Sequence, residues 1–315
     1  MDLFVWGANS HGQLGLGRYS ELVDSPVIIQ NIPENISELS CGGGHSALLS
    51  TGDLFLTGWN NKGQLGDGTT VDKCVFNKLE FNRKFAKVFC GWDRTAAITE
   101  ENQLLVWGSN MYNQLGFSNS TLSIIKRPKE LSLPFNDPID SVHFGLRHTA
   151  FLTTSCVAYI VGSLKHFKNS PHEIINHNST EYLRLNCEIH HIASGQNHIS
   201  YADDRNTIQG IGDNKFMQCS KIEQNAKIIR LSSGWTHNGF LTDNRELYTF
   251  GRNCYGQLGN DSRCDSLALP QKCQIHPVDD FALGAEHGIL LSRGEIYTWG
   301  WNEHGNCGNG CVDDV

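Results

Sequence analysis

The chain has 315 residues, of which 39% are hydrophobic and 18% charged, a composition typical of a globular protein and not of a disordered one. Its net charge of −8, without any run of lysine or arginine, argues against nucleic acid or an anionic membrane surface as a partner. No stretch approaches the ~20 apolar residues of a membrane span, and Met1 to Leu3 do not begin a secretory signal.

The first predicted strand starts a repeat that recurs along the whole sequence. Each copy is an apolar run ending in glycine. In six of the seven copies asparagine follows two residues later, the exception being Leu164, and the full form continues with Gly-Gln-Leu-Gly. The clear copies are LFVWGANSHGQLG from Leu3, LFLTGWNNKGQLG from Leu54, LLVWGSNMYNQLG from Leu104, LYTFGRNCYGQLG from Leu247 and IYTWGWNEHGNCG from Ile296, with fainter copies from Ala158 and Thr207. Their anchor glycines are Gly7, Gly58, Gly108, Gly162, Gly212, Gly251 and Gly300.

A second motif, Gly-x-x-His followed by small and apolar residues, precedes six of these anchors by 16 or 17 residues. Its glycines are Gly42, Gly91, Gly145, Gly195, Gly234 and Gly284. Successive anchors are about 50 residues apart, except for 39 residues between Gly212 and Gly251. Two motifs that keep a fixed offset in this way indicate a structural repeat.

Four short strands fit into each period, for example ISELSCG (36–42), HSALLS (45–50), DLFLTG (53–58) and CVFNKLE (74–80). This pattern predicts an all-β fold, a seven-bladed β-propeller in which residues 1–315 form a single domain. The N-terminus begins with a third strand, so seven anchors accompany only six Gly-x-x-His units. We therefore expect the first and last blades to be incomplete, the ring to be imperfectly sealed, and the sequence to be part of a longer protein.

Several segments of the repeat resemble the regulator-of-chromosome-condensation repeat: GGGHSAL (42–48), CGWD (90–93), GLRH (145–148), SGWTH (233–237) and WGWNEHG (299–305). The resemblance covers essentially the whole chain, and within the family it points to the branch of secretion-regulating guanine nucleotide exchange factors. It implies a seven-bladed propeller whose Gly-x-x-His turns face a small GTPase, and a role as an exchange factor in secretion or vesicle traffic. A protein-interaction scaffold without exchange activity is the alternative, because fold does not determine function.

Strand order alone predicts that the Gly-x-x-His turns and the loops after the anchor glycines lie on one face of the ring. We call this side the Gly-x-x-His face. Tryptophan, tyrosine and arginine with mixed charge are typical of protein–protein interfaces, and this face is rich in them. The predicted partner-binding residues are His45, Trp92, Asp93, Arg94, Arg147, His148, His198, Trp235, His237, Glu286, His287, Trp301, Glu303 and His304.

The repeated histidines, His45, His148, His198, His237 and His287, are open to two interpretations. We favour structural hydrogen bonding over partner contact, and we expect no metal, because the histidines are spread around a ring and no Cys/His spacing fits zinc. Arg94 replaces the histidine in the second copy, and this exception favours a partner-binding role for Asp93 and Arg94. In the exchange hypothesis, Asp93, Glu286, His148 and His237 would press on the phosphate and magnesium region of the GTPase.

The sequence contains no catalytic or cofactor motif: no GxSxG, no P-loop and no GxGxxG that opens a helix. We therefore expect a monomer without cofactor that binds a protein partner and makes or breaks no bonds. Cys41 and Cys90 share a repeat position with serines and are predicted to occupy a tight buried slot. Eleven scattered cysteines without a CxxC pair favour a reducing compartment, the cytoplasm, with the nucleus as an alternative.

The tryptophans are predicted to serve two purposes. Trp6, Trp107 and Trp299 directly precede anchor glycines and are predicted to form the core between blades. Trp301 follows an anchor glycine at a position that also accepts polar residues, so its side chain is predicted to point outward.

Overall fold

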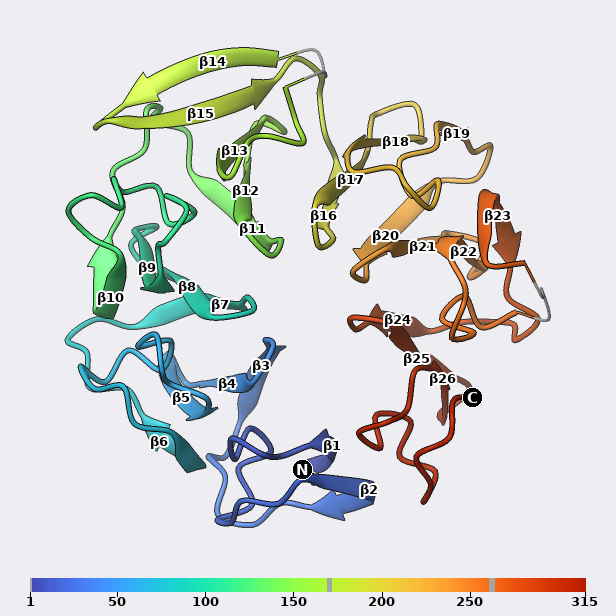
Figure 1. The fold of residues 1–315 in the computed structure, drawn as a ribbon, viewed down its shortest axis with the longest axis horizontal. Coiled ribbons are helices and arrows are strands. Elements are labelled where there is room, and N and C mark those ends of the chain that lie inside the picture. Colours follow the sequence, from blue (N-terminus) through green and yellow to red (C-terminus); the bar gives the residue numbers. More distant parts are fainter. Residues whose placement is uncertain (1, 169–171, 261–263) are drawn as a thin grey trace.

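The computed structural model describes residues 2–168, 172–260 and 264–315, and it is an all-β propeller (Figure 1). In these residues the strands form seven sheets, arranged around a central axis in chain order. Six sheets have three to five strands and are the blades; the remaining sheet is a pair of strands. The prediction of a β-propeller is confirmed, whereas seven full blades are not observed. The described residues contain no helix that could cross a membrane.

The strands are named in chain order. The pair is β1 (Phe4–Ala8) and β2 (Leu22–Ile28). Blade 1 is β3 (Ile36–Cys41), β4 (His45–Ser50), β5 (Asp53–Gly58) and β6 (Lys73–Lys78). Blade 2 is β7 (Phe85–Cys90), β8 (Arg94–Thr99), β9 (Leu104–Ser109) and β10 (Ile124–Glu130). Blade 3 is β11 (Ile139–Phe144), β12 (His148–Thr153), β13 (Ala158–Gly162), β14 (His172–His177) and β15 (Thr180–Leu185). Blade 4 is β16 (His191–Ser194), β17 (His198–Ala202), β18 (Thr207–Gly212) and β19 (Ile222–Glu223). Blade 5 is β20 (Ile228–Ser233), β21 (His237–Thr242), β22 (Leu247–Arg252) and β23 (Ser266–Lys272). Blade 6 is β24 (Asp280–Leu283), β25 (His287–Ser292) and β26 (Glu295–Gly300).

Within each blade the strands are antiparallel, and the first strand lies nearest the axis (Figure 1). The second and third strands carry most of the core. Every residue of β4, β8 and β12 is buried, which explains their small and apolar sequences. Such strands are covered on both sides, because each blade packs between two neighbours.

The anchor glycines mark the end of each third strand, where the chain leaves the ladder. Their φ angles lie between 95° and 114°, a region that other residues rarely adopt. Space excludes a side chain as well: a Cβ on Gly58 would lie 2.4 Å from the carbonyl oxygen of Gly44 and 2.7 Å from the Cα of His45. The glycine therefore lets the third strand cross the Gly-x-x-His turn of its own blade.

The asparagine that follows six of the seven anchors organises the next loop. The Oδ1 atom of Asn60 accepts the N–H of Leu65 at 3.0 Å, and that of Asn110 accepts the N–H of Leu115 at 2.9 Å. The glutamine of Gly-Gln-Leu-Gly adds a second bond, since Gln64 Oε1 accepts the N–H of Lys62 at 2.8 Å. The motif thus supplies the hydrogen bonds that a loop without secondary structure lacks.

Tryptophans before the anchor glycines join consecutive sheets. The indole N–H of Trp107 donates to the carbonyl of Gln64 at 2.8 Å, and that of Trp299 donates to Gln257 at 2.9 Å. Both side chains are buried, which confirms them as core between blades. Trp6 is half-buried and donates to Asn306 at 2.9 Å. The last loop and the β1–β2 pair are therefore joined by the same contact as neighbouring blades.

Candidate functional site

The Gly-x-x-His turns meet around the axis at one end of the propeller and are linked by backbone hydrogen bonds. These bonds run from Gly43 to Gly91 (3.2 Å), Leu146 to Gln196 (2.9 Å), Gln196 to Trp235 (2.9 Å) and Trp235 to Ala285 (2.7 Å). The loops after the anchor glycines surround this centre. Since the strands of each blade alternate in direction, both sets of loops lie on the same face, as the sequence predicts.

The repeated histidines lie beneath this face and not on it. His45, His148, His198 and His237 are at most 2% exposed, and His287 is half-buried. His45 Nε2 lies 2.9 Å from Thr95 Oγ1, and His198 Nε2 lies 2.9 Å from Asn238 Oδ1, so each of these contacts joins two blades. Burial lowers the pKa of His45 to about 3, which keeps the ring neutral.

Burial supports a structural role for the repeated histidines, and hydrogen bonds between blades are observed for His45 and His198, whereas among the described residues both ring nitrogens of His237 are buried without a hydrogen-bond partner. The burial also corrects the expectation of partner contact. His45, His148, His198 and His237 cannot touch a partner, because no part of their surface is available to one. The buried histidine also explains why the motif begins with glycine. A Cβ at Gly145 would lie 1.9 Å from Cε1 of His148, so a side chain there would overlap the ring.

Arg94 also differs from the prediction. Its side chain is fully buried and reaches from blade 2 into blade 3. There it donates to the carbonyls of Gly145, of Leu146 at 3.2 Å and of His148 at 2.9 Å. Asp93 accepts a bond from it at 3.0 Å and balances its charge. The exception in the repeat is therefore a contact between blades and not a partner-binding group.

Glu286 is likewise buried, and the expectation that it presses on a partner is wrong. Its carboxylate accepts hydrogen bonds from Gln257 Nε2 at 2.6 Å, Thr236 Oγ1 at 3.0 Å and Arg252 Nη1 at 3.1 Å. Burial raises the pKa of Glu286, and these three donors oppose that shift. The network joins blades 5 and 6, since Glu286 belongs to blade 6 and its donors to blade 5.

Two tryptophans occupy the centre of the face. Trp92 of blade 2 and Trp235 of blade 5 come from opposite sides of the ring, and their ring centroids lie 5.5 Å apart. Both are half-buried. Gly43 gives the Trp92 ring its space, because a Cβ there would lie 2.4 Å from the ring atom Cε3. On the same face, Arg147 is exposed and Asp93 keeps 18% of its side chain exposed.

A rim of aromatic and cationic contacts surrounds the tryptophan pair, and it includes the predicted residues Arg147, Trp301 and His304. The residue four positions after an anchor glycine contacts the next sheet around the ring. His11 stacks on Trp59 at 4.9 Å, and the Tyr255 ring lies 6.4 Å from that of Trp301. The recurrence of aromatic rings at this position is the signal that could have revealed the rim.

Cationic side chains complete the rim. Arg147 lies 4.7 Å above the ring of Tyr112, and Arg252 lies 5.0 Å above that of Phe216. Tyr112 is 42% exposed. Trp301 and His304 are half-buried and Glu303 is exposed, so these three predicted residues are accessible.

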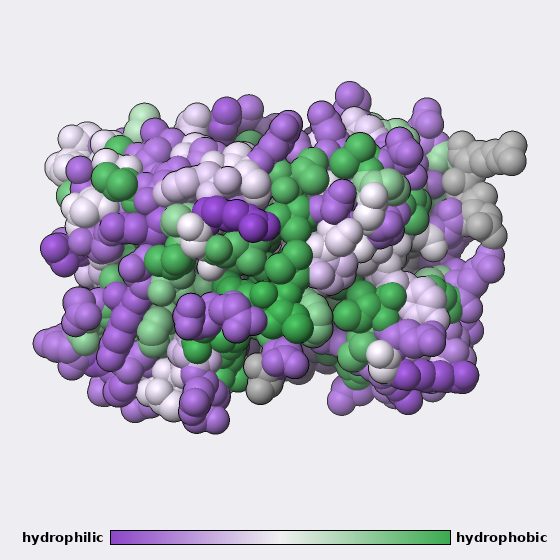
Figure 2. Space-filling view, turned by 90° about the horizontal axis from the view of Figure 1, so that it is seen from below, coloured by the Kyte–Doolittle hydropathy of each residue, from purple (hydrophilic) through white to green (hydrophobic). Residues whose placement is uncertain are grey.

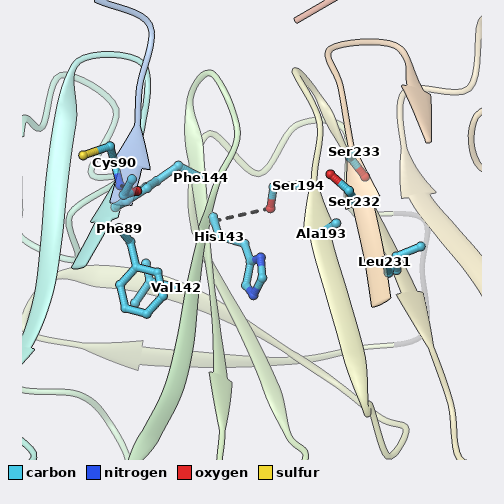
Figure 3. Close-up of a pocket in the computed structure, with 11 residues that line it drawn as sticks. Phe89, Cys90, Val142, His143, Phe144, Ala193, Ser194, Leu231, Ser232 and Ser233 are labelled. Atoms are coloured by element: carbon cyan, nitrogen blue, oxygen red, sulfur yellow. Dashed lines mark hydrogen bonds between the residues drawn. The ribbon is translucent and has the colours of Figure 1, made fainter. Parts of the chain in front are cut away.

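A cavity of about 210 Å³ lies near the axis, between the innermost strands of blades 1 to 5. Figure 3 shows its lining from β7, β11, β16 and β20, with Ser194 Oγ donating to the carbonyl of His143 at 3.3 Å. Cys90 lines this cavity and is half-buried, and Cys41 is exposed. The predicted tight buried slot for both is therefore wrong. Desolvation raises the pKa of Cys90, so its thiol is a poor nucleophile.

Comparison with known proteins supplies the family. The sequence model of the RCC1-like domain family matches residues 2–315 of this chain. The secretion-regulating guanine nucleotide exchange factor of Bos taurus is 32% identical over 284 residues, covering 82% of this chain and 61% of that protein. The ultraviolet-B receptor UVR8 of Arabidopsis thaliana is 28% identical over 278 residues, covering 82% and 62%. This chain spans about three-fifths of the length of these relatives.

Solved structures support the fold. Prp20p of Saccharomyces cerevisiae, described with its binding properties to Gsp1p and histones, has a TM-score of 0.87 at 21% identity. The match covers 100% of this chain and 84% of that one. Human WBSCR16 has a TM-score of 0.84 at 20% identity and covers 99% and 92%.

Proposed function

The chain belongs to the family of RCC1-like domains, and we propose that it binds a small GTPase through the Gly-x-x-His face and promotes release of the guanine nucleotide. The observation that carries the proposal is the Trp92–Trp235 pair, a half-buried aromatic centre on a face that also exposes Arg147. Tryptophan and arginine dominate protein–protein hot spots, and such residues cluster at the centre of an interface. The names of the bovine and mouse relatives, both guanine nucleotide exchange factors, support the choice of partner.

The proposed action requires no bond to be made or broken. An exchange factor binds the nucleotide-free GTPase more tightly than the nucleotide-bound form, and it accelerates release only by that difference in affinity. Trp92 and Trp235 would supply most of the binding energy. Of the four residues expected to contact the nucleotide region of the GTPase, Asp93 keeps an exposed part of its side chain, and it would act on the nucleotide site of the partner.

Stopped-flow release of a fluorescent guanine nucleotide, measured on a panel of small GTPases, tests this function. Trp92→Ala with Trp235→Ala should weaken partner binding by about 2 kcal/mol or more, roughly 30-fold. Arg293→Ala is the matched control, because Arg293 is exposed in the β25–β26 turn on the opposite face. If saturating protein accelerates release from no GTPase, the exchange function is refuted.

A scaffold function is the second candidate, because a relative of comparable similarity is named as an ultraviolet-B receptor. Affinity capture with and without GTP analogues separates the two functions. An exchange factor should prefer the nucleotide-free partner, whereas a scaffold should hold its partner equally in every nucleotide state.

Four finer expectations belong to the same proposal. We propose that the β1–β2 pair represents a seventh blade, since it joins its neighbour through the same tryptophan contact as the blades do. We also propose that the protein is a monomer that acts in secretion or vesicle traffic, and that it does so in the cytoplasm. Gel filtration with light scattering, and imaging of the tagged chain, test these expectations.

A further inference from the structure

Three side chains of different ligand types meet on the face opposite the Gly-x-x-His face. Cys156 lies in the turn between β12 and β13, and Glu188 and His190 lie in the link from β15 to β16. Their ligand atoms, a thiol sulfur, a carboxylate oxygen and a ring nitrogen, all lie within 4.8 Å of one another. The cluster is thus separate from the proposed partner-binding face.

The backbone holds these side chains together. The N–H of Ile189 donates to the carbonyl of Cys156 at 2.8 Å, and the Ile189 side chain is fully buried. Glu188 and His190 flank this buried residue, so in extended chain both point to the opposite side, toward solvent. Cys156 is fixed as well: its N–H donates to Thr153 at 3.0 Å, and its φ is 62°.

The spacing suits one tetrahedral ion. His190 Nε2 lies 3.4 Å from Glu188 Oε1. Zinc binds nitrogen and oxygen ligands at about 2.0–2.2 Å, which in a tetrahedron separates two such ligands by roughly 3.4 Å. The cluster faces solvent, with 42% of the His190 side chain and 61% of the Glu188 side chain exposed, so an ion can reach it.

We propose that Cys156, Glu188 and His190 bind a zinc-class divalent cation, with water in the fourth position. A thiolate and an imidazole select zinc over calcium or magnesium, which prefer oxygen ligands. One thiolate and one carboxylate neutralise a divalent charge.

No Cys/His spacing in the sequence fits zinc, so the proposed site differs from the expectation of no metal. Zinc sites are found in sequences by closely spaced Cys and His pairs. Here the Glu-x-His pair is local, but its cysteine lies in another turn, and only the fold brings it near. Binding would tie the β12–β13 turn to the link that enters blade 4.

Titration with Zn²⁺ and Co²⁺ tests the site in the full chain after treatment with a chelator and a thiol reductant. We expect one equivalent of Zn²⁺ to bind and to raise the melting temperature. Co²⁺ should give the near-ultraviolet charge-transfer band of a thiolate ligand and the intense visible bands of tetrahedral cobalt. Cys156→Ser should abolish the thiolate band, and His190→Asn and Glu188→Gln should abolish tight binding.

Two cysteine variants serve as matched controls. Cys187→Ser removes the thiol next to Glu188, which interacts with Tyr201, and Cys254→Ser removes an exposed thiol on the Gly-x-x-His face. Both should retain the cobalt spectrum, and the metal-free variants should melt as the metal-free parent does. The proposal is overturned if the parent chain shows no thiolate band, if Cys156→Ser keeps it, or if Cys187→Ser abolishes it.

Discussion

At the scale of single residues, Arg94 joins two blades where the turns lack a backbone bond. Such bonds link the turns of blades 1 and 2, 3 and 4, 4 and 5, and 5 and 6. Among the described residues none links blades 2 and 3, and there the guanidinium of Arg94 donates to the carbonyls of Gly145, Leu146 and His148. A histidine is too short to make these bonds, so the exception in the repeat has a structural cause.

Arg94→Ala should destabilise the fold by about 3 kcal/mol or more, because three carbonyls lose their charged donor and a cavity is left. Arg147→Ala, which removes an exposed arginine of the same face, should change stability by less than about 0.5 kcal/mol. Urea unfolding followed by fluorescence compares the two variants. Equal losses would contradict the assigned role of Arg94.

The buried histidines predict a pH dependence of stability. Burial lowers the pKa of His45 to about 3, of His198 to about 4 and of His237 to about 3. In the unfolded chain each ring takes up a proton below its ordinary pKa of about 6.5. The unfolded state therefore binds more protons, so the contribution of these histidines to the free energy of unfolding is fully present above pH ~6.5 and is lost as the pH falls toward about 3 to 4.

Urea unfolding between pH 7.5 and 5.5, values chosen around the ordinary histidine pKa of about 6.5, measures this effect. Each histidine contributes up to about 1.4 kcal/mol per pH unit below its unfolded pKa. His45→Gln should reduce the slope by one histidine's share. A free energy of unfolding that does not change over this range would rule out the neutral buried rings.

For single residues, the sequence predicts a role well when the residue recurs in several blades and poorly when it occurs in one blade. The loop-capping asparagines and the structural histidines could be predicted, because each serves the same purpose in several blades. The roles of Arg94 and Glu286 could not be predicted, because a repeat shows which positions correspond but not which residues of the neighbouring blade each side chain contacts. Both were assigned to the surface and are buried in contacts between blades.

At the scale of elements, strand bounds follow the repeat closely. The predicted strands 45–50 and 53–58 coincide with β4 and β5. The exception is blade 3, where the repeat is weak: β15 takes the place of a fourth strand, and β14 adds a fifth at its outer edge. A hairpin inserted into one blade has no counterpart in the other copies, so the repeat gave no template for it.

The anchor glycines allow a paired test at this scale. In Gly108→Ala the new Cβ would lie 2.5 Å from the Cα of Arg94 at a φ of 103°, so strain and overlap should cost about 3 kcal/mol or more. Gly294 has a φ of 84° with no atom within 4 Å, so Gly294→Ala should cost only about 1–2 kcal/mol. Thermal unfolding ranks the two, and equal costs would show that close contact at the anchors is unimportant.

At the scale of the whole molecule, the ring is closed by loops where the β1–β2 pair meets blade 6. Trp6 donates to Asn306, and Gly310 donates to Asp24 at 2.9 Å. Among the described residues β1 pairs only with β2, so its other edge has no strand neighbour there. Apolar side chains are exposed on the strands on either side of this seam, including Phe4 of β1 at 49% and Ile296 of β26 at 59%. Figure 2 shows apolar surface on this side of the ring.

This edge predicts self-association at high concentration, because an exposed apolar strand edge can pair with another chain. Phe4→Lys should reduce the association measured by light scattering. Leu269→Lys is the control, since Leu269 is 76% exposed but lies on β23, far along the chain from this edge. If both changes act equally, general surface apolarity and not the β1 edge drives association.

The chain of turn-to-turn hydrogen bonds also has a mechanical meaning. Together with the contacts of Arg94, these hydrogen bonds connect blades 1 to 6 in series, so a force applied to one blade is transmitted to the next. Among the described residues no such bond continues from blade 6 to the β1–β2 pair. Because these hydrogen bonds are missing at one interface, we expect blade 6 and the β1–β2 pair to separate first when the ring opens. Blades 2 to 5, which hold Trp92 and Trp235, should keep their relative positions.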